Sequence, residues 1–341
     1  MKQYLLPSEG TFYKANLHCH STCSDGHLTP EELKEVYKAK GYSVLAYSDH
    51  NVLVDHSDLD EDGFLTFTSC EYDINKKGEK ATAYRPCYHL NVYPPHQHHT
   101  ALPCFNPKYV WGKRTDLRDA QQYVGEPDFQ RDYENINDMI AEFNRQGFIV
   151  MANHPTWSVQ TLDDYRHVKG LFAMEMYNNG CYVEGYDEFN GHIYDDLLRQ
   201  GTRLWCTATD DNHNHHPKDA PRWDSCGGFT MIKAKELTYD AILEALKNGH
   251  FYASTGPEIK DMYIEDNQLH VKTSPAARIL VTTAARQAKI EYPQPGQDTL
   301  CEAVFDLSRV WPGYIRVTVE DGKGHFAWSQ PTFGEFSGRQ N

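Results

Sequence analysis

Residues 16–26 read Asn-Leu-His-Cys-His-Ser-Thr-Cys-Ser-Asp-Gly and follow a short apolar stretch that predicts a β-strand. Side chains alternate between the two faces of a strand, so His18 and His20 point to one face while Leu17 and Cys19 point to the other. Asp25 follows in a Ser-Asp-Gly turn, from which its carboxylate can reach the same cavity. The pattern therefore predicts a site for a divalent metal ion.

The chain has 341 residues, 40% of them hydrophobic, which is enough for one large domain and one small one. It contains no apolar run of membrane-spanning length, and its first residues lack the apolar core of a secretory signal. Its nine cysteines include no CxxC pair, as is typical of a reducing compartment. We therefore expect a cytoplasmic protein, or a secreted or periplasmic one if a signal was trimmed.

A formal net charge of −15 argues against binding to a nucleic-acid duplex, because no cluster of Lys and Arg is available to neutralise a phosphate backbone. No membrane contact is expected either, because no apolar run is long enough to span a bilayer. The sequence leaves open whether copies of the chain form a homo-oligomer.

Strands and helices alternate over the first three quarters of the chain, which predicts a parallel sheet. A helix is expected from Thr29, as N-cap, to about Lys40. Two strands follow, at 42–47 before Asp49 and His50 and at 64–69 before Glu71. Further strands are expected at 89–93, which opens with His89, and at 148–152, 171–176, 203–209 and 228–234, with helices at 128–146, 187–200 and 238–248.

Residues 94–127 lack regular periodicity and predict a long insertion over one face of the barrel. Its histidines at 96, 98 and 99 are interpreted as solvated loop residues, with a lid over the substrate cavity as the alternative. After Gly256-Pro257 the pattern changes to short alternating strands, at 261–264, 268–272, 278–283 and 314–319. The predicted domains are a barrel at 1–257 and a small all-β sandwich at 258–341.

Metal-binding residue types recur where the predicted strands end or begin. The candidate ligands are His18, His20, Asp25, His50, Glu71, His89, His154, Asp211 and His213. A single ion takes about four to six ligands, so two or three ions are needed. Nitrogen and oxygen ligands without thiolates favour Zn, Mn or Fe. Cys19 and Cys23 lie near these ligands in the sequence and are expected to pack in the interior.

These ordered motifs, His-x-His with Ser-Asp-Gly, Asp-His, a lone Glu, a lone His, Asn-His-Pro and Asp-x-His, resemble the PHP (polymerase and histidinol phosphatase) superfamily over about residues 12–257. The segment Phe251-Tyr252-Ala253-Ser254-Thr255-Gly256-Pro257 and the β-rich tail resemble its CehA/McbA-type branch. The resemblance implies a distorted (β/α)7 TIM-like barrel followed by an Ig-like sandwich, with a di- or trinuclear metal site.

The resemblance also distributes the ligands. It places the first metal on His18, His20, Glu71 and Asp211, and Glu71 bridges to a second metal held by His89 and His154. The third metal takes Asp25, His50 and His213. Asp25 stands where some members of the superfamily have a histidine. Asp211 is preferred to Asp210 as a ligand because of the Asp-x-His spacing.

Paired metals lower the pKa of a bridging water, which supplies hydroxide near neutral pH. Asp49 is expected to orient an adjacent imidazole. Arg85, Arg166 and His192 are candidates for binding a phosphate or protonating the leaving group, and motif position does not choose among them.

The favoured function is a phosphoesterase acting on a small phosphate mono- or diester through a metal-bridging hydroxide. One alternative is a metal-dependent hydrolase of carboxylic esters, amides or carbamates, because the same hydroxide attacks carbonyl carbon. A second alternative is a non-catalytic metal-binding scaffold protein.

Overall fold

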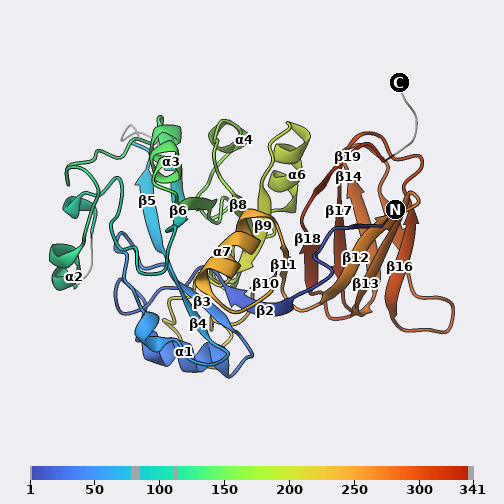
Figure 1. Cartoon of the computed structure of the whole chain (residues 1–341), viewed down its shortest axis with the longest axis horizontal. Helices are drawn as coiled ribbons and strands as arrows, with labels where there is room; N and C mark the ends of the chain where they lie inside the picture. Colours follow the sequence, from blue (N-terminus) through green and yellow to red (C-terminus); the bar gives the residue numbers. More distant parts are fainter. Residues whose placement is uncertain (1, 78–84, 111–113, 337–341) are drawn as a thin grey trace.

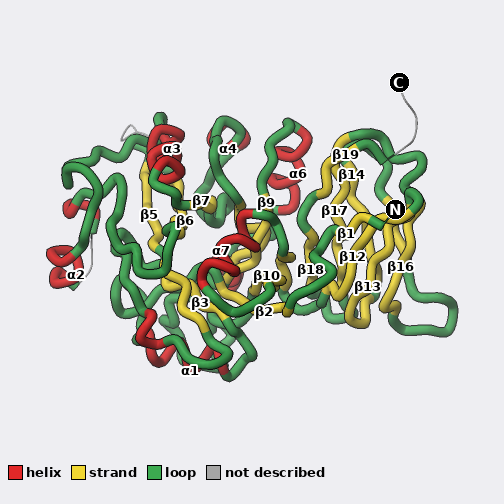
Figure 2. Tube along the Cα trace, viewed as in Figure 1, coloured by secondary structure: helices red, strands yellow, loops and turns green. Residues whose placement is uncertain are grey.

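The computed structural model describes residues 2–77, 85–110 and 114–336, and shows a mixed α/β protein with three β-sheets (Figure 1). Residues 111–113 of the predicted insertion and 337–341 of the predicted sandwich lie outside the described residues. Helices occur only before residue 257 in the described part of the chain, and the remainder consists of strands and loops (Figure 2). No helix in these described ranges is long and apolar enough to cross a membrane.

Strands and helices alternate in the first part of the chain. They are β1 (Gln3–Tyr4), β2 (Thr11–Asn16), α1 (Pro30–Lys38), β3 (Val44–Tyr47), η1 (Ser57–Leu59), β4 (Leu65–Thr68), β5 (Cys70–Asn75), β6 (Cys87–Tyr93), η2 (Pro107–Tyr109), α2 (Thr115–Ala120), α3 (Ile136–Arg145), β7 (Ile149–Ala152), α4 (Leu162–Tyr165), β8 (Ala173–Asn178), α5 (Asn179–Glu184), α6 (Gly191–Arg199), β9 (Trp205–Thr209), β10 (Phe229–Ala234), α7 (Tyr239–Lys247) and β11 (Phe251–Ser254).

Local chemistry explains where the helices begin. Thr29 and Glu32 form a capping box at the start of α1, where Pro30 occupies the first turn, as predicted. The predicted helix at 128–146 begins only at Ile136, and its buried face consists of Ile136, Met139, Ile140 and Phe143. Residues 128–135 are irregular because Arg131 is held by the loop and strand beside it, where it donates to the Asp73 backbone and side-chain oxygens at 2.6 and 3.0 Å.

The direction of the strands brings segments that are distant in the sequence close together where the parallel strands end. β2, β3 and β4 are parallel, as are β7, β8 and β9. β5 begins two residues after β4 ends, and β6 runs antiparallel to both β5 and β7. The five-stranded sheet of β5 to β9 is thus mixed rather than wholly parallel, and β2, β3 and β4 belong to another sheet. Because β6 runs in the opposite direction, its first half lies where the parallel strands end, which explains why His89 stands near the beginning of its strand.

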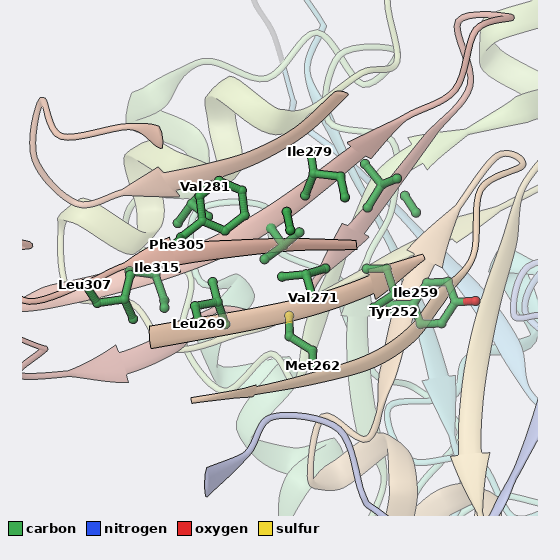
Figure 3. Close-up of a cluster of buried hydrophobic side chains, with 14 of the residues drawn as sticks. Tyr252, Ile259, Met262, Leu269, Val271, Ile279, Val281, Phe305, Leu307 and Ile315 are labelled. Atoms are coloured by element: carbon green, nitrogen blue, oxygen red, sulfur yellow. The ribbon is translucent and has the colours of Figure 1, made fainter. Parts of the chain in front are cut away.

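The C-terminal strands form two sheets around one apolar cluster. They are β12 (Ile259–Glu265), β13 (Gln268–Ala276), β14 (Arg278–Thr283), β15 (Lys289–Glu291), β16 (Leu300–Asp306), β17 (Gly313–Glu320), β18 (Phe326–Ser329) and β19 (Thr332–Gly334). Leu269 and Phe305 of one sheet belong to the same buried cluster as Val281 and Ile315 of the other (Figure 3).

Pairing continues across the predicted domain boundary at residue 257. β18 of the tail pairs with β11, so one ten-stranded sheet extends from β15 to β4. β1 at the other end of the chain pairs with β12. The division at 257 stays a prediction, and the two parts share a sheet.

A buried ion pair also joins the two parts. Arg316 of β17 donates two hydrogen bonds of 2.8 Å to the carboxylate of Asp195 on α6. Tyr314 donates a third, at 3.0 Å, to the same carboxylate. Asp195 and Arg316 are buried, so each needs the other as a partner.

Replacing Asp195 with Ala leaves the Arg316 guanidinium buried without its carboxylate, and we expect the free energy of unfolding to fall by about 3 kcal/mol. The control is Glu142→Ala, which removes a surface pair with Arg145 and is expected to cost about 1 kcal/mol or less. Urea unfolding of both variants provides the measurement. Equal losses would contradict the structural role of the buried pair.

Candidate metal centre

The structure brings all nine predicted ligands into three adjoining groups, in each of which the candidate ligand atoms lie within 4.8 Å of one another. The residues come from loops after β2, β3, β7 and β9 and from strands β5 and β6. The first group is His18, His20, Glu71 and Asp211, the second is Glu71, His89 and His154, and the third is His20, Asp25, His50 and His213.

Glu71 lies at the junction of the groups. Its Oε1 atom is 3.1 Å from His89 Nδ1 and 3.3 Å from His154 Nε2. Its Oε2 atom is 3.2 Å from His20 Nε2 and 3.4 Å from His50 Nε2. Oε1 also lies 3.3 Å from His18 Nε2 of the first group, so the carboxylate as a whole reaches residues of all three groups, as a bridging carboxylate requires.

His20 belongs to two groups, whereas the sequence assigned it to one. Its Nε2 atom is 3.1 Å from Asp211 Oδ1, and its Nδ1 atom is 3.5 Å from Asp25 Oδ1. Asp25 Oδ2 also lies 3.3 Å from His213 Nε2. The first and third groups are therefore contiguous.

Charge is concentrated at this centre. Burial disfavours the ionised carboxylate of Glu71, but the nearby imidazoles, foremost His18 and His89, hold its pKa well below the usual range. Burial likewise opposes protonation of His20, yet hydrogen bonds to Asp211 and Glu71 raise its pKa to about 10. These shifts indicate that the buried carboxylates favour positive charge beside them, whereas burial lowers the pKa of His50 in the third group to about 3.

Glu175 is a functional candidate for which the sequence analysis proposed no role. It is fully buried on β8, and His18 Nδ1 donates to its Oε1 at 2.7 Å. Thr209 Oγ1 donates to the same oxygen at 2.7 Å, and the backbone N–H of His154 donates to Oε2 at 2.8 Å. Glu175 thereby leaves His18 Nε2 as the nitrogen that faces the centre. The sequence feature that could have identified Glu175 is its position as a carboxylate within the otherwise apolar strand segment Ala-Met-Glu-Met-Tyr.

Among the described residues Asp49 makes no hydrogen bond to an imidazole, although its carboxylate lies within 4.8 Å of a ring nitrogen of His56. Its carboxylate instead accepts from the Ser21 backbone N–H at 2.9 Å and from the Ser21 and Ser24 hydroxyls at 2.7 Å each. Short side chains in a turn satisfy this carboxylate first, so Asp49 holds the turn that presents Asp25. Asp210 is likewise engaged elsewhere, by the backbone N–H groups of residues 226–228 and by Tyr37.

The three candidates for substrate contact lie away from the centre. His192 is 86% exposed on α6, beside Asp196. Arg166 pairs with Asp163, and Arg85 is exposed next to the segment outside the described residues. Neither arginine lines the cavity over the metal-ligand groups. The catalytic roles proposed for Arg85 and His192 therefore stay predictions, and the cavity lining gives them no support, because sequence motifs carry no information about where such isolated residues point.

A cavity of about 490 Å³ opens onto the centre, and seven of the nine candidate ligands line it. His18 and His20 are fully buried and do not line it. Its other walls come from Trp157, from α5 and from the loop after β9, including His215, His216, Arg222 and Asp224. The described part of the 94–127 insertion contributes no lining residue, and His98 in it is exposed beside Asp55. The exposure of His96 and His98 agrees with their interpretation as solvated residues, whereas His99 is half-buried beside Phe148. The lid alternative stays a prediction.

The fold and this site define a mixed α/β protein with clustered histidines and carboxylates beside a cavity. No family model matches the chain. A curated relative, a 5′-3′ exoribonuclease of Haemophilus influenzae, is 41% identical over 69 residues, which are 19% of this chain and 25% of the relative. The chain thus matches about a quarter of that relative's length.

Three solved structures are also similar. The first is a two-domain protein of Bacteroides vulgatus containing a predicted PHP-like metal-dependent phosphoesterase, with 17% identity, 96% and 98% of the two chains covered and a TM-score of 0.41. The second is a candidate metal-dependent phosphoesterase of Bifidobacterium adolescentis, with 16% identity, 63% and 91% coverage and a TM-score of 0.37. The third is an amidohydrolase of Chromobacterium violaceum with bound sulfate and no metal, with 16% identity, 58% and 87% coverage and a TM-score of 0.38.

The description of the Bacteroides vulgatus protein names the PHP class, which is the class that the ordered motifs of the sequence resemble. An amidohydrolase is also among the similar solved structures.

Replacing Glu71 with Gln removes the carboxylate that two of the groups share, so we expect bound metal to fall by about two ions per chain and activity to be lost with it. The matched control is Glu184→Gln, which changes a carboxylate on the cavity wall that belongs to none of the groups. Elemental analysis and hydrolysis assays measure both effects. Unchanged metal content in Glu71→Gln would overturn the bridging role.

Replacing Glu175 with Gln keeps the shape of the side chain but weakens its hold on His18, and we expect the affinity for metal to fall by about 10- to 100-fold. Glu188→Gln is the control, because Glu188 is equally buried but bonds to the Trp157 backbone and to Asn190. Competition with a chromogenic chelator reports both affinities. The positioning role is refuted if the two variants bind metal equally well.

Proposed function

We propose that this chain is a metal-dependent hydrolase of the PHP type, and specifically a phosphoesterase that cleaves a small phosphate mono- or diester. The observation that carries the proposal is the sharing of Glu71 and His20 among three ligand groups that adjoin one cavity. This arrangement suits two or three divalent ions that act together on one substrate.

The donor set fits such ions. It consists of imidazole nitrogens and carboxylate oxygens, a combination that suits Zn, Mn or Fe. In the part of the chain that the structure describes, the ion pairs of Asp25, Glu71 and Asp211 are all with histidines, so these carboxylates lack a lysine or arginine as a fixed cation. Divalent ions bound there supply a hydroxide nucleophile near neutral pH and Lewis-acid stabilisation of developing negative charge.

The protein's own residues prepare the site. Glu175 orients His18, and Asn153 Nδ2 donates to Glu71 Oε1 at 2.7 Å, which fixes the plane of the carboxylate. Ser158 Oγ lies 3.2 Å from His154 Nδ1. Trp157 packs beside the rings of His89 and His154 and shields that side of the centre from water. Pre-set ligands of this kind spare the reorganisation that would otherwise oppose catalysis.

The proposal also includes the architecture of the two parts of the chain, a barrel followed by a sandwich. The pairing of β2 to β4 and β5 to β9, with β10 beside β2, supports a distorted (β/α)7 barrel at 1–257. Hydrogen bonds between the Thr230 hydroxyl and the Ala208 backbone link β10 to β9 and support closure of that barrel. The two sheets around the C-terminal apolar cluster support a sandwich at 258–341.

The cavity favours a small anionic substrate. Arg222 is the only arginine or lysine that lines it among the described residues, and it lies on the same loop as His215 and His216. These groups can bind phosphate oxygens that the metals leave free. The name of the Haemophilus influenzae relative, an exoribonuclease, adds weight to a phosphodiester as substrate. The cavity is too small and the chain too acidic for a duplex.

A hydrolase of carboxylic esters, amides or carbamates is the second candidate. The specific observation in its favour is the scarcity of cations in the cavity, together with Trp157 and Val183 in its wall. A neutral carbonyl substrate needs no arginine and would pack against such apolar surface.

The test uses protein loaded with Mn or Zn and three chromogenic substrates, namely a phosphate monoester, a phosphodiester and a carboxylic ester. We expect hydrolysis of a phosphate ester that chelation abolishes. We also expect Arg222→Ala to raise KM for that ester about tenfold with little change in kcat, since the cation binds a charge present before the reaction.

Arg166→Ala is the control, because Arg166 lies outside the cavity and should leave KM unchanged. Hydrolysis of the carboxylic ester alone would replace the phosphoesterase with the second candidate. Metal binding without any hydrolysis would favour a scaffold protein.

A further inference from the structure

A fourth group of metal-type side chains lies outside the candidate centre. It consists of Cys23, Asp49 and His56, whose candidate ligand atoms all lie within 4.8 Å of one another. Cys23 and Asp49 are buried and His56 is half-buried. Cys23 comes from the turn after β2, and the other two residues come from the loop between β3 and η1. Of the groups formed by the described residues, only this one includes a thiol.

His56 provides an independent observation. Its Nε2 atom is buried and has no hydrogen-bond partner among the described residues. Its ring packs against Tyr47, with the ring centroids 4.7 Å apart. Buried polar atoms in native proteins nearly always have a partner, because losing water without replacement is costly. This nitrogen therefore calls for a partner other than a protein side chain.

Asp49 has room for one more interaction. Its Oδ1 atom accepts from the Ser21 backbone N–H and the Ser24 hydroxyl, whereas among the described residues Oδ2 accepts only from the Ser21 hydroxyl. A carboxylate oxygen has two acceptor positions, so Oδ2 retains one. The hydrogen bonds also hold the carboxylate in place, as partners of metal ligands commonly do.

We propose that Cys23, Asp49 and His56 bind a zinc ion separate from the candidate catalytic centre. A thiolate, an imidazole and a carboxylate form a donor set that Zn²⁺ prefers, and water completes the tetrahedron. Binding converts the Cys23 thiol to a thiolate and releases its proton to the buffer. The ion joins the turn that carries Asp25 to the loop that carries His50, and so fixes two ligands of the third group relative to each other.

Cobalt substitution tests this site without reference to catalysis. A cysteine thiolate bound to Co²⁺ gives a charge-transfer band in the near ultraviolet, whereas histidine and carboxylate ligands do not. We expect the cobalt-loaded protein to show this band, and Cys23→Ser to lack it while retaining the visible bands of the other sites. We also expect His56→Gln to bind about one zinc ion fewer per chain. Circular dichroism checks that both variants fold.

Cys181→Ser is the matched control. Cys181 Sγ lies 3.8 Å from Asp211 Oδ2. A metal ion in the candidate centre could therefore bind this thiol and give the same band. The proposal is overturned if the unmodified protein has no thiolate band, if the band survives in Cys23→Ser, or if it disappears in Cys181→Ser instead. Because the band reports ligation alone, its presence or absence does not depend on whether any ester is hydrolysed.

Discussion

The structure depends on the burial of two carboxylates, Glu71 and Asp211, among imidazoles. Their exposed fractions are 1% and 7%, and isolated charges at such depth would be strongly unfavourable. His18 and His20 compensate this cost by approaching Asp211 Oδ1 at 3.1 Å each. Charge of opposite sign must therefore be present at this place, as protons or as metal ions, and the surrounding residues are arranged accordingly.

Strand direction is the means by which the fold satisfies this requirement. Parallel strands deliver the loops after β3, β7 and β9 to one edge, while the antiparallel β6 delivers His89 from its first half. Unusual backbone conformations also help to place two of the ligands, since His154 and Asp211 have φ values of +24° and +50°. Non-glycine residues adopt such angles at a cost, and they occur most often where a functional geometry is enforced.

Much of the centre was predictable because its information is local. The His-x-His spacing correctly indicated that both rings face one way, although β2 ends at Asn16 and the two histidines lie in the segment that follows. The helix N-cap at Thr29 and the ends of the strands could likewise be predicted from the sequence. The contacts of Asp49 with Ser21 and Ser24 were not, since they depend on how a turn folds back. α5 was missed because Asn179 and Gly180 obscure any helical pattern, and β1 pairs with a strand more than 250 residues away.

Anomalous diffraction from crystals of metal-loaded protein, recorded at the absorption edge of the bound metal, tests the central claim most directly. The account predicts peaks within the three ligand groups, with Glu71 placed between two of them. It would be contradicted by a fully loaded protein whose metal peaks lie elsewhere, or whose Glu71 and Asp211 contact no ion.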